Sequence, residues 1–248
     1  MSFSADYFSD VAARYAAYRP SYPPALVDYL REVTRGDTAW DIGCGSGQLT
    51  IALAARFDRV IATDPATAQL AEAPAHPHVE YRNCPAEDSG LADGSIDLAV
   101  AAQAAHWFDW PRFVDEVARV THADSIIALI GYRNPELEGE TGREVTAFIE
   151  NIAGPYWPDG RAHINNGYRE LVLPWPSLEV PAIEMAVTWT RDEFLGYASS
   201  WSATNRLRKA RGSAEFDAFC TRIAARWPDG ELRRVVWPLI LSVSRVTS

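Results

Sequence analysis

Short apolar runs alternate with amphipathic stretches between residues 39 and 130, and this alternation limits the folds that the chain can adopt. Strands are predicted for five apolar runs, at residues 39–42, 60–63, 79–82, 96–101 and 126–130. Helices are predicted where apolar residues recur at helical spacing, at residues 49–56, 65–73 and 112–120. Strands joined through helices form parallel units, and nearly continuous apolar strands are typical of a sheet covered on both faces. The chain is therefore expected to form a doubly wound α/β fold with a mostly parallel sheet.

The segments outside this core are expected to be mainly helical. Residues 1–36 form a predicted helical cap, in which a proline-rich break at residues 19–24 separates two helices. Residues 133–248 are expected to carry helices near 141–151 and 191–226 and the last two strands near 181–187 and 235–243. The length of 248 residues fits one domain, in which residues 37–132 form the core and the C-terminal helices are an insertion between the last two strands.

Composition disfavours several classes of partner. Asp and Glu number 33 against 23 Lys and Arg, and the resulting net charge of −10 repels phosphodiester backbones and anionic lipids. We expect no nucleic-acid and no membrane partner, and a monomer or a homodimer. Cys44, Cys84 and Cys220 form no C-x-x-C pair, so neither a disulfide framework nor a metal site is expected. With no signal sequence and no apolar run of about 18 residues, the chain is expected in the cytoplasm.

The most informative motif follows the first predicted strand and opens a helix; it reads Trp40-Asp41-Ile42-Gly43-Cys44-Gly45-Ser46-Gly47-Gln48. Alternate glycines let the backbone turn sharply and let a ligand approach the main chain, where a side chain would collide with it. Dinucleotide-binding folds use a similar turn with the spacing G-x-G-x-x-G, but the third glycine of that pattern would fall here at Gln48 or Thr50. A plain tight turn is the remaining alternative.

An acidic residue followed by x-Gly-x-Gly-x-Gly resembles the first motif of class I S-adenosylmethionine-dependent methyltransferases. This resemblance covers about residues 4–132 and implies a seven-stranded, Rossmann-like sheet with S-adenosylmethionine as the cofactor. Within the motif it implies cofactor contacts for Asp41, Gly43, Cys44, Gly45 and Gly47.

Two further segments carry the resemblance. Asp64, followed by Pro65, ends the second predicted strand at the separation expected for a carboxylate that accepts hydrogen bonds from ribose hydroxyls. The same Asp is alternatively a helix N-cap, with Pro65 at a first helical position. Ala86-Glu87, ahead of Ser95-Ile96-Asp97, resembles a family signature in which the Ala-Glu pair borders the adenine, although Glu87 taken alone is simply a loop carboxylate.

The loop after the fourth predicted strand should face both cofactor and substrate, because ligands of open α/β sheets bind outside the carboxyl ends of strands. It reads Ala102-Gln103-Ala104-Ala105-His106-Trp107-Phe108-Asp109. Together with Gly131-Tyr132 and the N-terminal residues 15–23, it resembles the methyltransferase type 11 subgroup that includes trans-aconitate-type enzymes. One departure is that residues 121–125 replace the Pro-Gly-Gly turn usual before the fifth strand.

Several roles follow for these segments. Gln103 is predicted at the cofactor, and His106, Trp107 and Tyr132 at the substrate. His106 is the candidate general base, and alternatively a substrate-orienting or packing residue.

The N-terminal segment is expected to contribute a lid. Arg19 could pair with the methionine carboxylate of the cofactor through its planar guanidinium, while Tyr15 and Tyr22 close over the site. Alternatively, Tyr15 belongs to the buried face of a surface helix.

The C-terminal half carries most of the aromatic residues and is expected to form the substrate pocket. Candidate pocket residues are Trp189, Tyr197, Trp201 and Arg206, because aromatic walls exclude water and an arginine favours an anionic acceptor. Tryptophans at helical spacing are alternatively core, and the basic run at residues 206–211 is alternatively a solvated helix face.

The resulting hypothesis is an enzyme that transfers a methyl group from S-adenosylmethionine to a small molecule, at an oxygen of a small organic acid, and releases S-adenosylhomocysteine. A carboxylate acceptor is already ionised near neutral pH and needs no base, whereas a hydroxyl or amine would benefit from one. Two alternatives remain open: a methyltransferase-like protein that binds the cofactor without catalysis, and an NAD-dependent oxidoreductase, which the glycine spacing disfavours.

Overall fold

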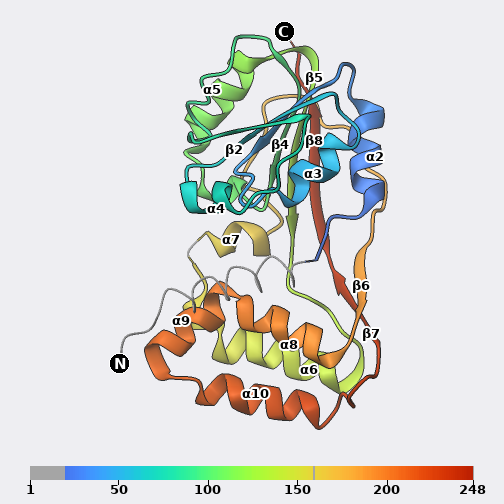
Figure 1. Cartoon of the computed structure of the whole chain (residues 1–248), viewed down its shortest axis with the longest axis vertical. Helices are drawn as coiled ribbons and strands as arrows, with labels where there is room; N and C mark the ends of the chain where they lie inside the picture. Colours follow the sequence, from blue (N-terminus) through green and yellow to red (C-terminus); the bar gives the residue numbers. More distant parts are fainter. Residues whose placement is uncertain (1–19, 159, 248) are drawn as a thin grey trace. The chain divides into compact units, whose positions relative to one another are not determined.

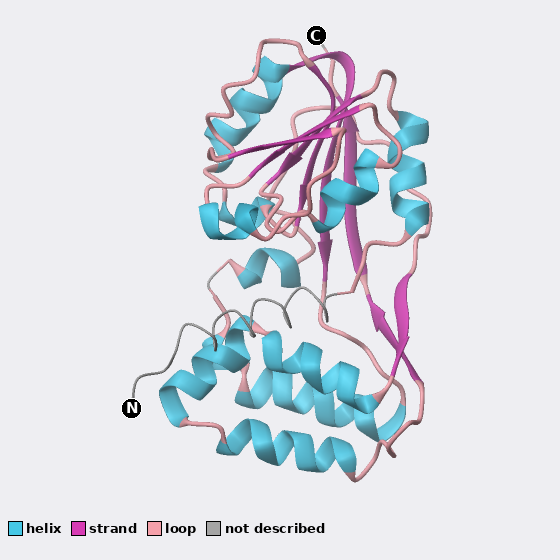
Figure 2. Cartoon of the chain, in the orientation of Figure 1, coloured by secondary structure: helices cyan, strands magenta, loops and turns pink. Residues whose placement is uncertain are grey.

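The computed structural model describes residues 20–158 and 160–247, and these residues pack as two compact units. The sheet unit comprises Ser21–Arg133, Ala162–Glu184 and Leu239–Ser248, and the helical unit contains Asn134–Arg161 and Met185–Pro238. Figure 2 shows most strands in the sheet unit and helices in both units. The predicted core at residues 37–132 lies wholly in the sheet unit, whereas the expectation of a single domain over the chain stays a prediction.

The sheet unit contains six strands in the order β3-β2-β1-β4-β5-β8 (Figure 1). The strands are β1 (Thr38–Ile42), β2 (Arg59–Thr63), β3 (Val79–Arg82), β4 (Ile96–Ala102), β5 (Thr121–Tyr132) and β8 (Leu239–Arg245). All neighbours are parallel except β5 and β8, which run antiparallel. The doubly wound, mostly parallel fold is therefore confirmed.

The predicted strand count of seven is wrong, because the structure has six strands in this sheet. The segment expected to be one strand at 235–243 forms two, β7 (Arg233–Trp237) and β8, on either side of Pro238. Proline has no N–H to donate to a ladder, so it separates the two pairings. The strand expected near 181–187 is β6 (Met185–Trp189), which pairs antiparallel with β7 in a separate two-stranded sheet of the helical unit.

Helices cover both faces of the six-stranded sheet, as the apolar strands predict. On one face, α2 (Pro24–Val33) and α3 (Gln48–Ala54) pack Leu30 and Leu53 against Leu98 and Val100 of β4. The opposite face packs against α5 (Trp110–Val120) through a second cluster, which includes Phe113, Val117, Ala99, Ala101 and Leu129. Alternate residues of β4 thus enter opposite cores, and α4 (Thr67–Ala71) completes the helices between strands.

The segment that departs from the family pattern is part of the long strand β5. Residues 121–125 are part of this strand, and its pairing with β4 shifts register between Ile96 and Leu98. Asp124 has a φ of +76°, and its N–H donates to the carbonyl of Val246. The missing Pro-Gly-Gly turn therefore leaves the order of strands unchanged.

The helical unit is built around a cluster of packed aromatic rings. Its helices are α6 (Gly139–Ala147), which continues as the π-helical turn η2 (Phe148–Ile152), the short η3 (Gly154–Tyr156), α8 (Arg191–Ser200), α9 (Ser202–Arg211) and α10 (Ala214–Ala224). Between the units in sequence lies α7 (Arg161–Asn165). Phe148 stacks on Phe219 with ring centroids 4.2 Å apart, and Phe194 packs against Trp227. Thr190 begins α8 with a capping box formed with Glu193.

A buried carboxylate fastens the loop before β4 to α5. Glu116 Oε1 accepts hydrogen bonds from the backbone N–H and the hydroxyl of Ser89, while Arg119 donates from Nε at 2.9 Å and from Nη2 at 2.8 Å. Arg119 also donates to the carbonyl of Leu91. The hydrogen bonds from Arg119 lower the pKa of Glu116 to about 2.

Replacing this carboxylate should destabilise the fold in a pH-dependent way. A folded-state pKa below the unfolded value means that Glu116 stabilises the protein above about pH 4.5 and loses this contribution as the pH falls towards 2. We expect Glu116→Gln to lower the free energy of unfolding by about 2 kcal/mol at pH 7, with the difference disappearing towards pH 2. Urea denaturation of both proteins between pH 7 and pH 2 measures this difference in the free energy of unfolding. The matched control is Asp115→Asn, which changes an exposed neighbour in α5. An equal loss of unfolding free energy in both variants would contradict a stabilising role for the hydrogen bonds of Glu116.

Candidate functional site

The three glycines of the motif lie between β1 and α3, and each has a positive φ: +67° at Gly43, +56° at Gly45 and +82° at Gly47. A Cβ on Gly43 would lie 2.6 Å from the Cβ of Ala104, and one on Gly47 would lie 2.7 Å from the Oη of Tyr81. On Gly45 a Cβ would find its nearest neighbour at 3.8 Å, the Oε1 of Gln69. Gly43 and Gly47 are therefore required by packing, whereas Gly45 faces space that a ligand can occupy.

Asp64 ties the glycine loop to the end of β2. Its Oδ2 accepts a hydrogen bond from the N–H of Gly45 and its Oδ1 accepts one from Ala66, both at 2.8 Å. The predicted helix at 65–73 begins later, because α4 starts at Thr67 with Ala66 as its N-cap, so Pro65 precedes the helix. Each carboxylate oxygen retains a lone pair, so Asp64 can still accept hydrogen bonds from ligand hydroxyls.

Asp41 and Cys44 lie at the base of the same loop. Asp41 is only 1% exposed, and the hydroxyl of Thr50 donates to its Oδ2 at 2.6 Å. Burial raises the pKa of Asp41 to about 7, and burial likewise raises the pKa of the half-buried Cys44 thiol. Asp41 and Cys44, both predicted at the cofactor, therefore lie on the protein-facing side of the glycine loop, where they pack beneath it.

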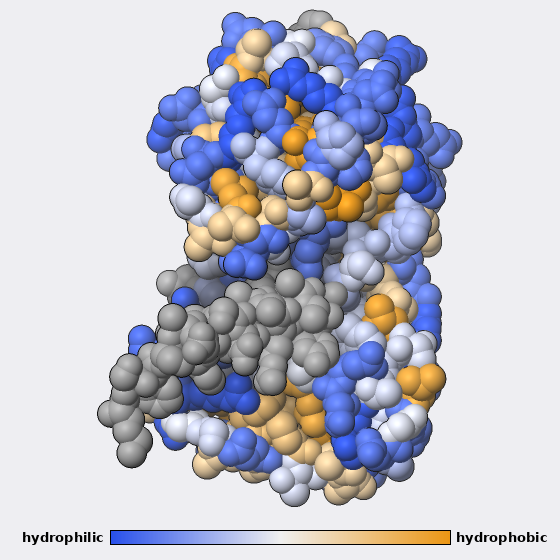
Figure 3. Space-filling model, in the orientation of Figure 1, coloured by the Kyte–Doolittle hydropathy of each residue, from blue (hydrophilic) through white to orange (hydrophobic). Residues whose placement is uncertain are grey.

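The Ala86-Glu87 segment lies beside the loop that follows β4. Ala86 is buried in the α5-side core, and Glu87 Oε1 accepts a hydrogen bond of 2.7 Å from the N–H of Asp109. Two loops far apart in sequence thus meet at the carboxyl edge of the sheet. In the view of Figure 3, hydrophobic residues (orange) lie along the lower border of the sheet unit, and the part of this unit above them is largely hydrophilic (blue).

Gln103 follows β4 in a strained conformation with a φ of +54°. Its N–H donates to the carbonyl of Ile130 at 2.8 Å, and its Nε2 donates to the carbonyl of Tyr132 at 3.2 Å. Within residues 20–158 and 160–247, its buried Oε1 has no hydrogen-bond partner. A strained residue that presents an unsatisfied buried acceptor is typical of a ligand site.

His106 lies in the short helix η1 (Ala105–Trp107) and contacts a residue that the sequence did not predict. Its Nδ1 is 3.2 Å from the Oη of Tyr168, and its ring lies tilted against that of Trp107, with 4.9 Å between centroids; Trp107 is 62% exposed. The one sequence signal that could have indicated a special backbone conformation at Tyr168 is the preceding pair Asn166-Gly167, which is typical of a turn. Tyr132 ends β5 and meets the ring of Tyr22 edge-on, at 6.3 Å between centroids.

Of the remaining predicted residues, Arg19 and Tyr15 lie outside the described residues. The four substrate candidates of the C-terminal half belong to the helical unit. Tyr197 and Trp201 are each 7% exposed, and Trp237 Nε1 donates to the Oη of Tyr197 at 3.0 Å. The ring of Trp189 lies tilted against that of Tyr197 and edge-on to that of Trp237. Arg206 is exposed on α9. Packing in the aromatic core explains the positions of Trp189, Tyr197 and Trp201 without a ligand. Their role at a substrate therefore stays a prediction.

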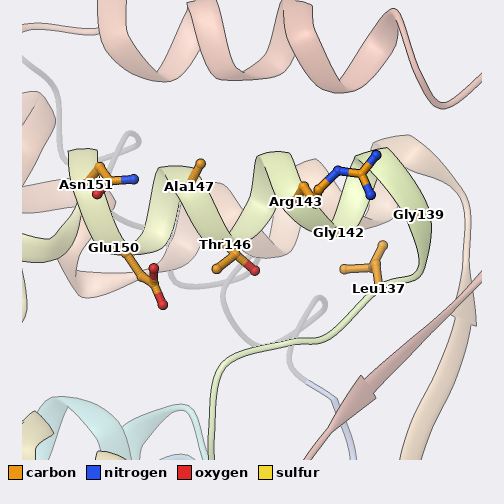
Figure 4. A pocket seen from close by; sticks show the side chains of 8 residues that line it. All are labelled: Leu137, Gly139, Gly142, Arg143, Thr146, Ala147, Glu150 and Asn151. Carbon is orange, nitrogen blue, oxygen red and sulfur yellow. The ribbon is translucent and has the colours of Figure 1, made fainter.

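The helical unit has an open groove of about 420 Å³ along α6 and η2 (Figure 4). Its polar lining comprises Arg143, Thr146, Glu150 and Asn151, and Leu137 and three small residues complete it. The π-helical geometry of η2 places Glu150 and Asn151 at one end of this groove. Such a turn often marks a functional segment.

Two further classes of site are absent from the part of the chain that the structure describes. No three His, Cys, Asp or Glu side chains there are grouped so that they could hold a metal ion. In the same residues, no helix has the length and apolar character needed to cross a bilayer.

Comparison with known proteins gives one consistent result. The family model described as "Methyltransferase domain" matches residues 40–129, which span the glycine loop, Asp64 and β4. A Dictyostelium discoideum protein named as a methyltransferase is 31% identical over 210 residues, covering 83% of this chain and 80% of that protein. A Saccharomyces cerevisiae protein named as an S-adenosylmethionine-dependent methyltransferase is 32% identical over 135 residues, covering 50% of this chain and 46% of that protein.

A solved structure agrees with these relatives. It is that of a protein from Anaeromyxobacter dehalogenans named as a type II methyltransferase, which is 39% identical. The match covers 92% of this chain and 98% of that one, with a TM-score of 0.87.

The open face of Gly45 leads to a test of the loop. We expect Gly45→Val to weaken binding of S-adenosylhomocysteine by at least about 100-fold, because the side chain fills the space beside the backbone while the sheet stays folded. Titration calorimetry and circular dichroism measure the two effects. Gly230→Val is the matched control, since Gly230 also has a positive φ and open surroundings but lies in the helical unit. Near-normal affinity in Gly45→Val would remove the loop from the binding site.

The buried Asp41 leads to a second test. Its raised pKa means that the folded state keeps a proton which the unfolded state has released, so its ionisation lowers stability as the pH rises from about 4 to about 7. We expect Asp41→Asn to remove on the order of 2 kcal/mol of this pH dependence. Urea denaturation without ligand at pH 5 and pH 8 measures the change, with Asp58→Asn on the surface as control. An unchanged dependence in Asp41→Asn would contradict the buried, protonated state.

Proposed function

Because this chain belongs to the methyltransferase-domain family, we propose that it transfers the methyl group of S-adenosylmethionine to an oxygen of a small organic acid. The observation that carries this proposal is the glycine loop, in which Gly45 presents open backbone beside the carboxylate of Asp64. The loop lies at the carboxyl edge of a parallel sheet, where ligands of such folds bind.

The residues at this edge fit the cofactor. Asp64 retains acceptor capacity for ribose hydroxyls, and Ala86 and Glu87 border the expected adenine position. Gln103 Oε1 is a buried acceptor without a hydrogen-bond partner among the described residues, and the amino group of the cofactor can donate a hydrogen bond to it. The backbone around Gly45 leaves room for the methionine part.

S-Adenosylmethionine, when bound, supplies a methyl group on a positively charged sulfur. The residues of the chain then have to orient the acceptor oxygen in line with that methyl group and exclude water. Trp107 and Tyr132 offer aromatic walls at the carboxyl edge, beside His106. An ionised carboxylate carries the attacking electron pair already, so this acceptor requires no proton transfer.

Charge and composition support a small acceptor. A net charge of −10 opposes binding to nucleic acid, and we propose a cytoplasmic enzyme, monomeric or homodimeric. Membership of the trans-aconitate-type subgroup stays a prediction from residues 15–23, 102–109 and 131–132.

The function is tested by binding and turnover with the purified chain. We expect titration calorimetry to give a micromolar Kd for S-adenosylhomocysteine and no binding of NAD. A panel of small carboxylic acids and phenols is then incubated with S-adenosylmethionine, and release of S-adenosylhomocysteine is followed by chromatography. Turnover of an acid supports the proposal, and turnover of phenols alone overturns the organic-acid acceptor. Binding without any turnover favours the catalytically silent protein, and absence of cofactor binding overturns the proposal as a whole.

A further inference from the structure

The hydroxyl of Tyr81 on β3 lies against Gly47, at the end of the glycine loop. A Cβ on Gly47 would lie 2.7 Å from this oxygen, and 3.5 Å from both Ala73 Cβ and Pro74 Cδ. Three segments that are separate in sequence therefore meet here: the glycine loop, β3 and the segment that follows α4. The absence of a side chain at Gly47 is what lets Tyr81 approach the loop.

The same hydroxyl forms a hydrogen bond to the segment after α4. Tyr81 Oη donates to the carbonyl of Pro74 at 3.0 Å. Burial, followed by the nearby Cys44 and Asp41, raises the pKa of Tyr81 to about 12. The phenol therefore keeps the proton that it donates at neutral pH, and one oxygen atom holds Pro74 while it contacts Gly47.

Helix α4 depends on contacts at its two ends. None of its five residues is buried, and a helix of this length is too short to be stable alone. At its start, Asp64 accepts hydrogen bonds from the N–H groups of Ala66 and Gly45. Beyond its end, Pro74 is held by Tyr81. Both ends of α4 are therefore tied to side chains that also contact the glycine loop.

Helix α4 also borders the open space at Gly45. The nearest heavy atom to a Cβ on Gly45 is Oε1 of Gln69, an exposed residue of α4, at 3.8 Å. A ligand that lies against the backbone of Gly45 would therefore meet both the loop and this helix. Because a shift of either one changes the space between them, the contacts that hold α4 to the loop also determine its shape.

We propose that Tyr81 is a positioning residue for the cofactor, which holds the glycine loop and α4 at the separation that S-adenosylmethionine requires. This rests on the proposed methyl transfer from that cofactor. Tyr81 acts through Gly47 and Pro74, so its loss should weaken cofactor binding without slowing the transfer step once the cofactor is bound.

Hydrogen exchange in the ligand-free protein tests the hold on the loop. By NMR, we expect Tyr81→Phe to speed exchange of the Gly45 and Gly47 amides about 10-fold, because loss of one hydrogen bond makes local opening easier. Tyr29→Phe is the matched control, since that hydroxyl also donates to a backbone carbonyl, the one of Glu179 at 2.9 Å. The control should leave both amides unchanged. Equal exchange in Tyr81→Phe and the wild type overturns the assignment.

Binding and turnover separate positioning from a purely structural role. Titration calorimetry with S-adenosylhomocysteine should give a Kd about 10-fold higher for Tyr81→Phe, and an unchanged Kd for Tyr29→Phe. With an acid that is turned over, KM for S-adenosylmethionine should rise by a similar factor while kcat changes less than about twofold. If Tyr81→Phe lowers the thermal stability but leaves Kd unchanged, the side chain is only structural and the proposal is overturned.

A double variant tests the contact between Tyr81 and Gly47. Gly47→Ala places a methyl group against the hydroxyl at a positive φ, and it should weaken binding of S-adenosylhomocysteine by at least about 30-fold. Tyr81→Leu removes that oxygen, so the double variant Gly47→Ala/Tyr81→Leu should bind at least about threefold more tightly than Gly47→Ala alone. If the effects of the two substitutions simply multiply, the contact does not act as proposed.

These experiments also separate this inference from the wider function. If the wild type binds no S-adenosylhomocysteine, the proposed methyl transfer is overturned, and the exchange rates of the ligand-free protein still decide whether Tyr81 holds the loop. If the wild type binds S-adenosylhomocysteine and Tyr81→Phe matches it in exchange and in affinity, the role of Tyr81 is overturned and the proposed methyl transfer stands.

Discussion

The hydrogen bond from the N–H of Gly45 to the carboxylate of Asp64 joins the two strand ends on which the site depends. Because β1 and β2 are parallel neighbours, their carboxyl ends lie at the same edge of the sheet, and the glycine loop and Asp64 follow these ends side by side. The same carboxylate also fixes the turn into α4 through Ala66. One side chain therefore orders the loop from within the protein while keeping acceptor capacity for a ligand.

Sequence patterns predicted those parts of the site that depend on local backbone geometry. Alternate glycines after an apolar strand predicted the loop between β1 and α3, and the acidic end of β2 predicted Asp64. The partner of His106 was missed because Tyr168 lies 62 residues away in sequence, in a segment without regular periodicity.

The aromatic residues of the C-terminal half show how tertiary packing limits what a sequence pattern predicts. Trp189, Tyr197 and Trp201 have the spacing and chemistry of pocket walls, and the same properties suit them to a core. In the structure they pack against Trp237 of β7 and Phe148 of η2, and large rings of this kind contribute strongly to a core. The sequence also could not show that Pro238 divides one apolar run between two sheets.

The antiparallel pairing of β5 with β8 has a consequence for how the chain is made. Residues 239–245 hydrogen-bond along β5 from Ile126 to Tyr132, so the edge of the sheet is completed by a segment more than a hundred residues downstream. Residues 134–161 and 185–238 of the helical unit lie between these two strands in sequence. Within that unit, β6 and β7 form a separate two-stranded sheet. Such long-range pairing raises contact order and slows folding. During synthesis, the hydrogen-bonding edge of β5 that faces β8 therefore stays open until residues 239–245 have been made.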